Sequence, residues 1–81
     1  MKEKVAAMIQ QRTGMSATQE AILASTDLFR DGFLDSLASV SLVHELEREF
    51  QVKIGPFLIT RTNLASVDAI MALVERRRAK P

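Results

Sequence analysis

The clearest amphipathic helix of this chain is predicted from Ser36 to about Phe50, with Asp35 placed to cap its start. Apolar residues recur along this stretch at the three- and four-residue spacing of one helix face. The predicted apolar stripe consists of Leu37, Val40, Leu42, Val43, Leu46 and Phe50. Of this stripe, we expect Val40, Leu46 and Phe50 to be buried in the core.

Two further amphipathic helices are predicted towards the ends of the chain. The first covers residues 2–11, and Gly14 is its expected stop. Its apolar face consists of Val5, Met8 and Ile9. The last helix is expected to have Ser66 as its N-cap and Asp68 in its first turn. Its apolar face consists of Val67, Ile70, Met71 and Val74. These faces require three main helices around one core.

The connecting segments are less regular. Residues 15–34 show no sustained period, so we expect a long loop that is either functional or held in place by its own apolar residues. Gly55 and Pro56 are expected to interrupt regular secondary structure. The short apolar stretch of residues 57–59 then predicts a brief helical turn.

Composition narrows the function classes. A chain of 81 residues is expected to form one domain spanning residues 1–81. It has no cysteine, which fits a reducing compartment and excludes both thiolate zinc sites and cysteine nucleophiles. Since no disulfide can form, the stability of the fold must come from helix packing. No apolar stretch approaches the roughly 20 residues of a membrane span. Since the chain also lacks a signal-peptide core, we expect a cytoplasmic protein, and we expect it to be a monomer. The net charge of +1 favours neither nucleic acid nor an anionic membrane as a partner.

The basic C-terminal stretch has two interpretations. Arg76, Arg77 and Arg78 complement the negative end of the last helix dipole, and this is the preferred explanation. A nucleic-acid-binding three-helix protein is the alternative, and it would rest only on the stretch from Arg76 to Lys80.

The inventory of reactive side chains argues against an enzyme. His44 is the only histidine, and it lies two helical turns beyond Ser36, too far for a hydrogen bond between the two side chains. The three glycines are isolated and form no phosphate-binding loop. The carboxylates of Glu45, Glu47 and Glu49 lack a convergent set of metal ligands.

Ser36 is the most informative residue. It stands just inside a predicted helix start, preceded by Asp35 and followed by Leu37, where helix-terminal N–H groups favour an incoming phosphate. That placement suits a modification site, although serine and aspartate at such positions are most often caps alone.

The stretch Asp35-Ser36-Leu37, continued through residues 38–50, resembles the Asp-Ser-Leu motif and second helix of the acyl carrier protein family. Residues 62–70 resemble the entry into the family's final helix. The resemblance implies an all-α four-helix bundle with three main helices, a long loop between the first and second helices, and a short third helix near residues 57–61.

The same resemblance implies a covalent cofactor. A phosphopantetheinyl transferase would attach 4′-phosphopantetheine from coenzyme A to Ser36, and the arm would hold acyl or aminoacyl cargo as a thioester. Asp35 would cap the helix and present the serine, and Leu37 would contact the transferase and other partners. A chain without cysteine needs such a prosthetic thiol.

The resemblance also implies partners that dock on the second helix. An acyl or aminoacyl ligase would load the carrier, and an acyltransferase or ketosynthase would unload it. The partner-binding residues expected on this helix are Leu37, Ser41, His44, Glu45 and Arg48.

Three departures point away from the fatty-acid branch of the family. The positions of Ala38, Ser41 and Arg48 are commonly acidic in bacterial fatty-acid carriers, whereas the approach from Asp31 to Ser36 resembles D-alanyl carrier proteins. We therefore expect a specialised lipid, polyketide or nonribosomal-peptide-like pathway. The alternatives are a primary fatty-acid carrier and, from another class, a helical adaptor that carries no arm.

Overall fold

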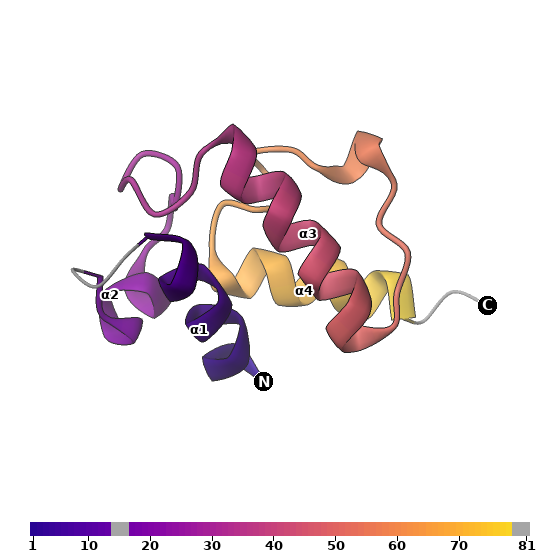
Figure 1. Cartoon of the computed structure of the whole chain (residues 1–81), viewed down its shortest axis with the longest axis horizontal. Coiled ribbons are helices and arrows are strands. Elements are labelled where there is room, and N and C mark those ends of the chain that lie inside the picture. The colour runs from indigo at the N-terminus through magenta and orange to yellow at the C-terminus, as the bar shows by residue number, and fades with distance from the viewer. Residues whose placement is uncertain (14–16, 79–81) are drawn as a thin grey trace.

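The computed structural model of the chain describes residues 1–13 and 17–78, and within them it contains four α-helices and one short 3-10 helix (Figure 1). The helices are α1 (Lys2–Thr13), α2 (Gln19–Ala24), α3 (Ser36–Phe50), η1 (Pro56–Leu58) and α4 (Val67–Arg78). The expected all-α bundle is confirmed. The expected stop of the first helix at Gly14 lies outside the described residues, as does Lys80.

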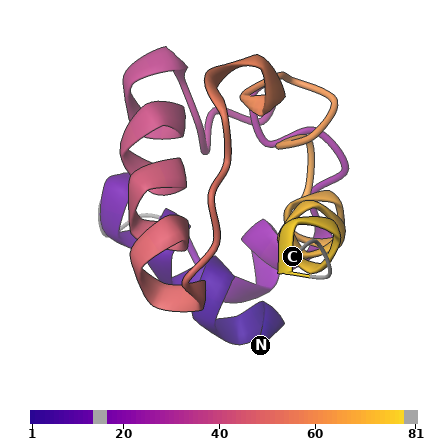
Figure 2. The ribbon, with the colours of Figure 1, turned by 90° about the vertical axis from the view of Figure 1, so that its right-hand side faces the viewer.

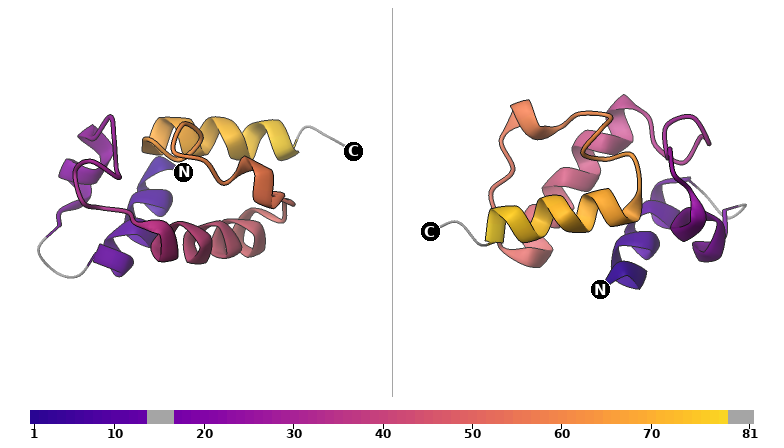
Figure 3. Two further views of the ribbon diagram at one scale, coloured as in Figure 1. Left: turned by 90° about the horizontal axis from the view of Figure 1, so that it is seen from above. Right: turned by 180° about the vertical axis from the view of Figure 1, so that it is seen from behind.

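The helices pack around α1, which contacts α2, α3 and α4. Figure 2 shows α3 and α4 on opposite sides of the molecule, with α1 at its lower end. The chain leaves the end of α3, passes through η1 and returns to the beginning of α3 before α4 starts (Figure 3). This return path places residues 59–64 beside the start of α3.

The core draws on all four α-helices and on the loops between them. Its buried apolar residues are Val5, Ala6, Met8, Ile9, Ala17, Ile22, Leu28, Leu34, Leu42, Val43, Leu46, Val52, Ile54, Leu64, Val67, Ile70, Leu73 and Val74. The last helix begins as predicted, because the Ser66 hydroxyl accepts a hydrogen bond from the Ala69 N–H at 3.0 Å. On its buried face Leu73 is fully enclosed, whereas Met71 is only half-buried.

The segment predicted as one long loop contains a helix, so that part of the prediction is wrong. Thr18 caps α2 by accepting a hydrogen bond from the Ala21 N–H at 3.1 Å, and Ile22 is buried. Six residues are too few for a helical period to stand out in the sequence. The rest of the segment is held by its own apolar residues, as expected: Leu28 is fully buried, and its N–H donates to the Ala65 carbonyl at 2.7 Å.

The predicted bounds of α3 are correct, but its buried face is rotated from the predicted one. Leu46 is fully buried and Phe50 half-buried, whereas Leu37 is 85% exposed and Val40 44% exposed. Ser39 lies on the buried face of α3 instead. Its hydroxyl donates to the Asp35 carbonyl at 2.6 Å, so its burial leaves no polar group without a hydrogen-bond partner. A count of apolar residues overlooks a buried serine.

The implied third helix is shorter than expected and begins earlier. The structure has only the 3-10 turn η1, with Gly55 as N-cap and Pro56 at the first helical position. None of the three residues of η1 is buried, and Phe57 is 93% exposed. The brief helical turn predicted after Gly55 and Pro56 is thus present, but it ends at Leu58.

The arginines at the end of α4 form hydrogen bonds or ion pairs with other residues of the chain. Arg76 donates to the Asn63 side chain at 3.3 Å, Arg77 donates to the Lys53 carbonyl at 2.7 Å, and Arg78 pairs with Glu75 at 3.7 Å. These contacts support a structural role for the stretch. No described helix has the length and apolar character needed to cross a bilayer.

Candidate functional site

Ser36 is the first residue of α3, and its side chain is exposed. Asp35 caps the helix as predicted: its Oδ1 accepts from the Ala38 N–H at 2.8 Å, and its carbonyl accepts from the Ser39 N–H at 2.9 Å. Among the described residues, none forms a hydrogen bond with the Ser36 hydroxyl. The cap therefore fixes the helix start while leaving this hydroxyl available.

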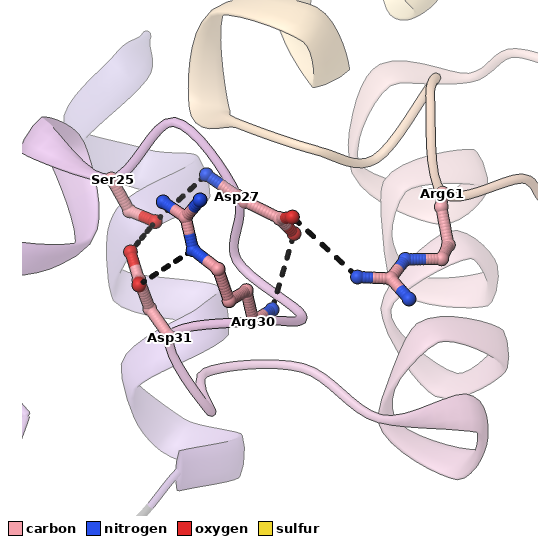
Figure 4. Close-up of polar contacts among 5 residues, drawn as sticks. All are labelled: Ser25, Asp27, Arg30, Asp31 and Arg61. Atoms are coloured by element: carbon pink, nitrogen blue, oxygen red, sulfur yellow. Dashed lines mark hydrogen bonds and ion pairs between the residues drawn. The ribbon is translucent and has the colours of Figure 1, made fainter.

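A polar cluster orders the loop that leads to Ser36 (Figure 4). The Ser25 hydroxyl donates to Asp31 Oδ2 at 2.6 Å, and Asp27 Oδ1 accepts from the Arg30 N–H at 3.1 Å. The pKa of Asp27 lies below its ordinary value, mainly because the Arg30 N–H donates to its carboxylate, with further lowering by the charges of Arg61 and Arg30. The cluster thus cross-links the turn in front of α3.

Arg61 joins this cluster from the other side of the site. Its Nη2 lies 3.5 Å from Asp27 Oδ2, and its guanidinium carbon lies 5.3 Å from the centre of the Phe29 ring. Figure 4 shows the side chain reaching from the returning segment towards the loop before α3. Arg61 thus connects two segments that are far apart in sequence.

A cavity of about 280 Å³ adjoins Ser36. Its lining residues are Phe29, Ser36, Ser39, Val40, Ile59, Thr60, Arg61 and Leu64. Half of these side chains are apolar, and the polar ones are three hydroxyls and the Arg61 guanidinium. A larger hollow of about 520 Å³ lies at the other end of α3, beside Glu47 and Lys53, and does not include Ser36. The cavity at Ser36 is therefore placed to receive a group attached to this residue.

Four of the five residues predicted to bind partners form one exposed ridge along α3. Leu37, Ser41, His44 and Arg48 are all exposed and follow the helical spacing of a single face. Leu37 is exposed and is therefore accessible to a partner. The structure thus brings these four positions together on the surface.

Glu45, the fifth predicted residue, lies at the edge of this ridge and is bound by Arg12 of α1. Arg12 Nη2 lies 2.7 Å from Glu45 Oε1 and donates to Ser41 Oγ at 3.0 Å, while Nη1 donates to the Met8 carbonyl at 2.8 Å. No local pattern predicts this role for Arg12, because the contact joins two helices that are far apart in sequence.

The other two carboxylates of α3 are engaged as well. Glu47 Oε2 accepts from the Ile54 N–H at 2.8 Å, and Glu49 pairs with Lys4 at 2.6 Å. The ridge itself therefore presents one apolar side chain, the Ser41 hydroxyl, the His44 imidazole and the Arg48 guanidinium. Within the described ranges, no group of three or more His, Cys, Asp or Glu side chains could hold a metal ion.

Sequence reasoning missed most of the cavity. Phe29, Ile59, Thr60 and Arg61 come from loops, and no periodic pattern links them to Ser36. The sequence offered no signal for Arg61 beyond its being a basic residue in the segment that resembles the short third helix.

Comparison with known proteins agrees with this geometry. The family model described as a phosphopantetheine attachment site matches residues 3–74. A D-alanyl carrier protein of Lactococcus lactis subsp. lactis (strain IL1403) is 30% identical over 78 residues, which are 96% of each chain. A probable acyl carrier protein, PigG, of Serratia sp. (strain ATCC 39006) is 34% identical over 67 residues, covering 83% of this chain and 77% of the relative. No solved structure matched.

The family match covers most of the chain and includes the Asp35-Ser36-Leu37 motif on which the resemblance rested. Carrier proteins of this kind are non-catalytic and work with a phosphopantetheinyl transferase and with ligases or synthases. The chain therefore belongs to the phosphopantetheine-binding carrier protein family, whose members hold acyl groups as thioesters on a covalently attached 4′-phosphopantetheine arm.

Proposed function

We propose that this chain is a stand-alone carrier of one domain, dedicated to a specialised pathway, and that its arm is attached to Ser36. The observation that carries the proposal is the placement of an exposed serine hydroxyl at the first position of a capped helix, beside a cavity. The positive end of the helix dipole favours a phosphate at this position. Since the chain has no cysteine, the arm supplies the thiol that forms the thioester.

Attachment requires one bond to form and one to break. Ser36 Oγ attacks the phosphorus atom of coenzyme A that bears the pantetheine, and the phosphoanhydride bond breaks, so that adenosine 3′,5′-bisphosphate leaves. The hydroxyl proton passes to a base on the transferase. Asp35 keeps Ser36 at the helix start, and the exposed Leu37 offers the transferase an apolar contact next to the reacting hydroxyl.

The ridge of Leu37, Ser41, His44 and Arg48 is the proposed docking face for the loading and unloading enzymes. Because Glu45, Glu47 and Glu49 are bound within the chain, this face offers little negative charge to a basic enzyme surface. Complementary charge sets the rate of encounter and discriminates between partners. A carrier with this face suits a dedicated ligase and transferase better than the enzymes of housekeeping fatty-acid synthesis.

The printed names of the relatives describe two kinds of carrier, one for D-alanyl groups and one probably for acyl groups. Both fit the proposed role of a dedicated carrier. The proposed cargo of this chain is accordingly an aminoacyl or acyl group that a ligase loads onto the thiol of the arm.

Intact-mass measurement tests the attachment site. After incubation with coenzyme A and a broad-specificity phosphopantetheinyl transferase, we expect the protein to gain the mass of one phosphopantetheine. Ser36→Ala should abolish the gain, whereas Ser41→Ala, an exposed serine on the same helix, should retain it. Modification of the Ser36→Ala protein, or no modification of the native protein by several transferases, would contradict the proposal.

A further inference from the structure

Arg61 is the one charged side chain among the described residues that line the cavity at Ser36. The rest of the lining consists of apolar groups and of the hydroxyls of Ser36, Ser39 and Thr60. A cation in such a wall is unexpected if the cavity serves only apolar cargo. Its position beside the proposed attachment residue indicates a ligand with negative charge.

The neighbours of Arg61 orient its guanidinium without saturating it. Asp27 approaches Nη2 at 3.5 Å, and the Phe29 ring lies beneath the guanidinium carbon at 5.3 Å. Asp27 is itself fixed by the Arg30 N–H. A guanidinium has five N–H donors, and the arrangement in Figure 4 uses one of them in a long contact. The Arg61 side chain is 69% exposed, so the remaining donors are accessible.

An arm on Ser36 would bring an anion to this place. The phosphodiester is bonded directly to Ser36 Oγ and carries one negative charge at neutral pH, and Ser36 and Arg61 line the same cavity. The carboxylate of Asp35, the residue that precedes Ser36, already accepts from the Ala38 N–H. Guanidinium groups bind phosphate oxygens with a planar pair of donors, which a lysine cannot reproduce.

We infer that Arg61 is a positioning residue that binds the phosphodiester of the arm and bridges it to Asp27. This inference rests on the proposed attachment at Ser36. With its phosphodiester bound by Arg61, the first part of the arm would lie next to the cavity that Val40 and Ile59 help to line.

Arg30 provides a matched control. It belongs to the same polar cluster, its side chain is as exposed as that of Arg61, and Arg30 Nε lies 3.7 Å from Asp31 Oδ1. It does not line the cavity at Ser36. Removing its charge therefore perturbs the cluster without removing the proposed phosphate ligand.

The test compares the apo and arm-bearing forms of the native protein, Arg61→Lys, Arg61→Gln and Arg30→Gln. Intact mass first shows whether each protein is modified, so failure of the attachment proposal is seen before this inference is tested. The difference in melting temperature between the two forms is then measured at low and high salt. The Nε–H resonances of Arg61 and Arg30 are followed by NMR in the native protein.

We expect the arm to raise the melting temperature of the native protein by about 2 to 4 °C at low salt, and by less at high salt. Arg61→Gln should lose this difference, Arg61→Lys should keep part of it, and Arg30→Gln should keep all of it. In the native protein, modification should shift the Arg61 resonance and leave that of Arg30 in place. The inference would be overturned if the arm raised the melting temperature of the native and Arg61→Gln proteins by the same amount. It would also be overturned if modification of the native protein left the Arg61 Nε–H resonance in place.

Discussion

Charge reversal on the ridge of α3 would test the proposed choice of partners. Ser41→Glu adds one negative charge, and Arg48→Glu replaces a positive charge by a negative one. Both positions are exposed on the ridge. Ala38 is left unchanged because it is half-buried and its N–H is part of the Asp35 cap. The double substitution therefore makes the docking face acidic without disturbing the start of the helix.

The structure limits the size of the effect. An exposed ion pair contributes about 0 to 1 kcal/mol, and 1.4 kcal/mol corresponds to a tenfold change in affinity. Arg12 already donates to the Ser41 hydroxyl at 3.0 Å, so it would partly neutralise a carboxylate at position 41. Position 48 has no such neighbour among the described contacts. We therefore expect loading by housekeeping fatty-acid enzymes to improve by about threefold to tenfold.

The assay compares loading rates of arm-bearing native and doubly substituted proteins by a fatty-acid ligase or ketosynthase at low and high ionic strength. The gain should shrink as salt rises, because salt screens exposed charges. Arg78→Glu makes the same exchange at an exposed position of α4 and should leave the rates unchanged. Efficient loading of the native protein with no gain from the double substitution would refute the reasoning and favour a primary fatty-acid carrier.

Two further predictions concern the fold. In denaturant titration, Leu46→Ala should lower the free energy of unfolding by about 2 to 5 kcal/mol. Val40→Ala, at a position that is 44% exposed, should lower it by less than about 1 kcal/mol. Equal losses of unfolding free energy would show that the buried face of α3 is misassigned. The lowered pKa of Asp27 stabilises the fold above the ordinary value of 3.8, and this contribution is lost as pH falls through the folded value. The amide resonance of Arg30 should therefore titrate with a midpoint below 3.8, and a higher midpoint would contradict the assignment.

Local signals in the sequence identified the elements that depend on local contacts. The bounds of α3 were predictable because Asp35 bonds to the N–H of Ala38, three residues away, and Ser66 acts in the same way on α4. The Asp35-Ser36-Leu37 motif and the stretch that follows it were sufficient to indicate the carrier family, which the family match confirms. These features need no information about how the helices pack.

Tertiary packing decided the rest. Whether Ser39 or Val40 faces the core depends on how α3 rotates against its neighbours, and the hydrogen bond from the Ser39 hydroxyl removes the cost of burying it. Arg12 reaches Glu45, and Arg61 reaches Asp27, only because helices and loops far apart in sequence lie side by side. Spacing along a chain determines which residues share a helix face, but contacts between segments arise from the packing of the whole core.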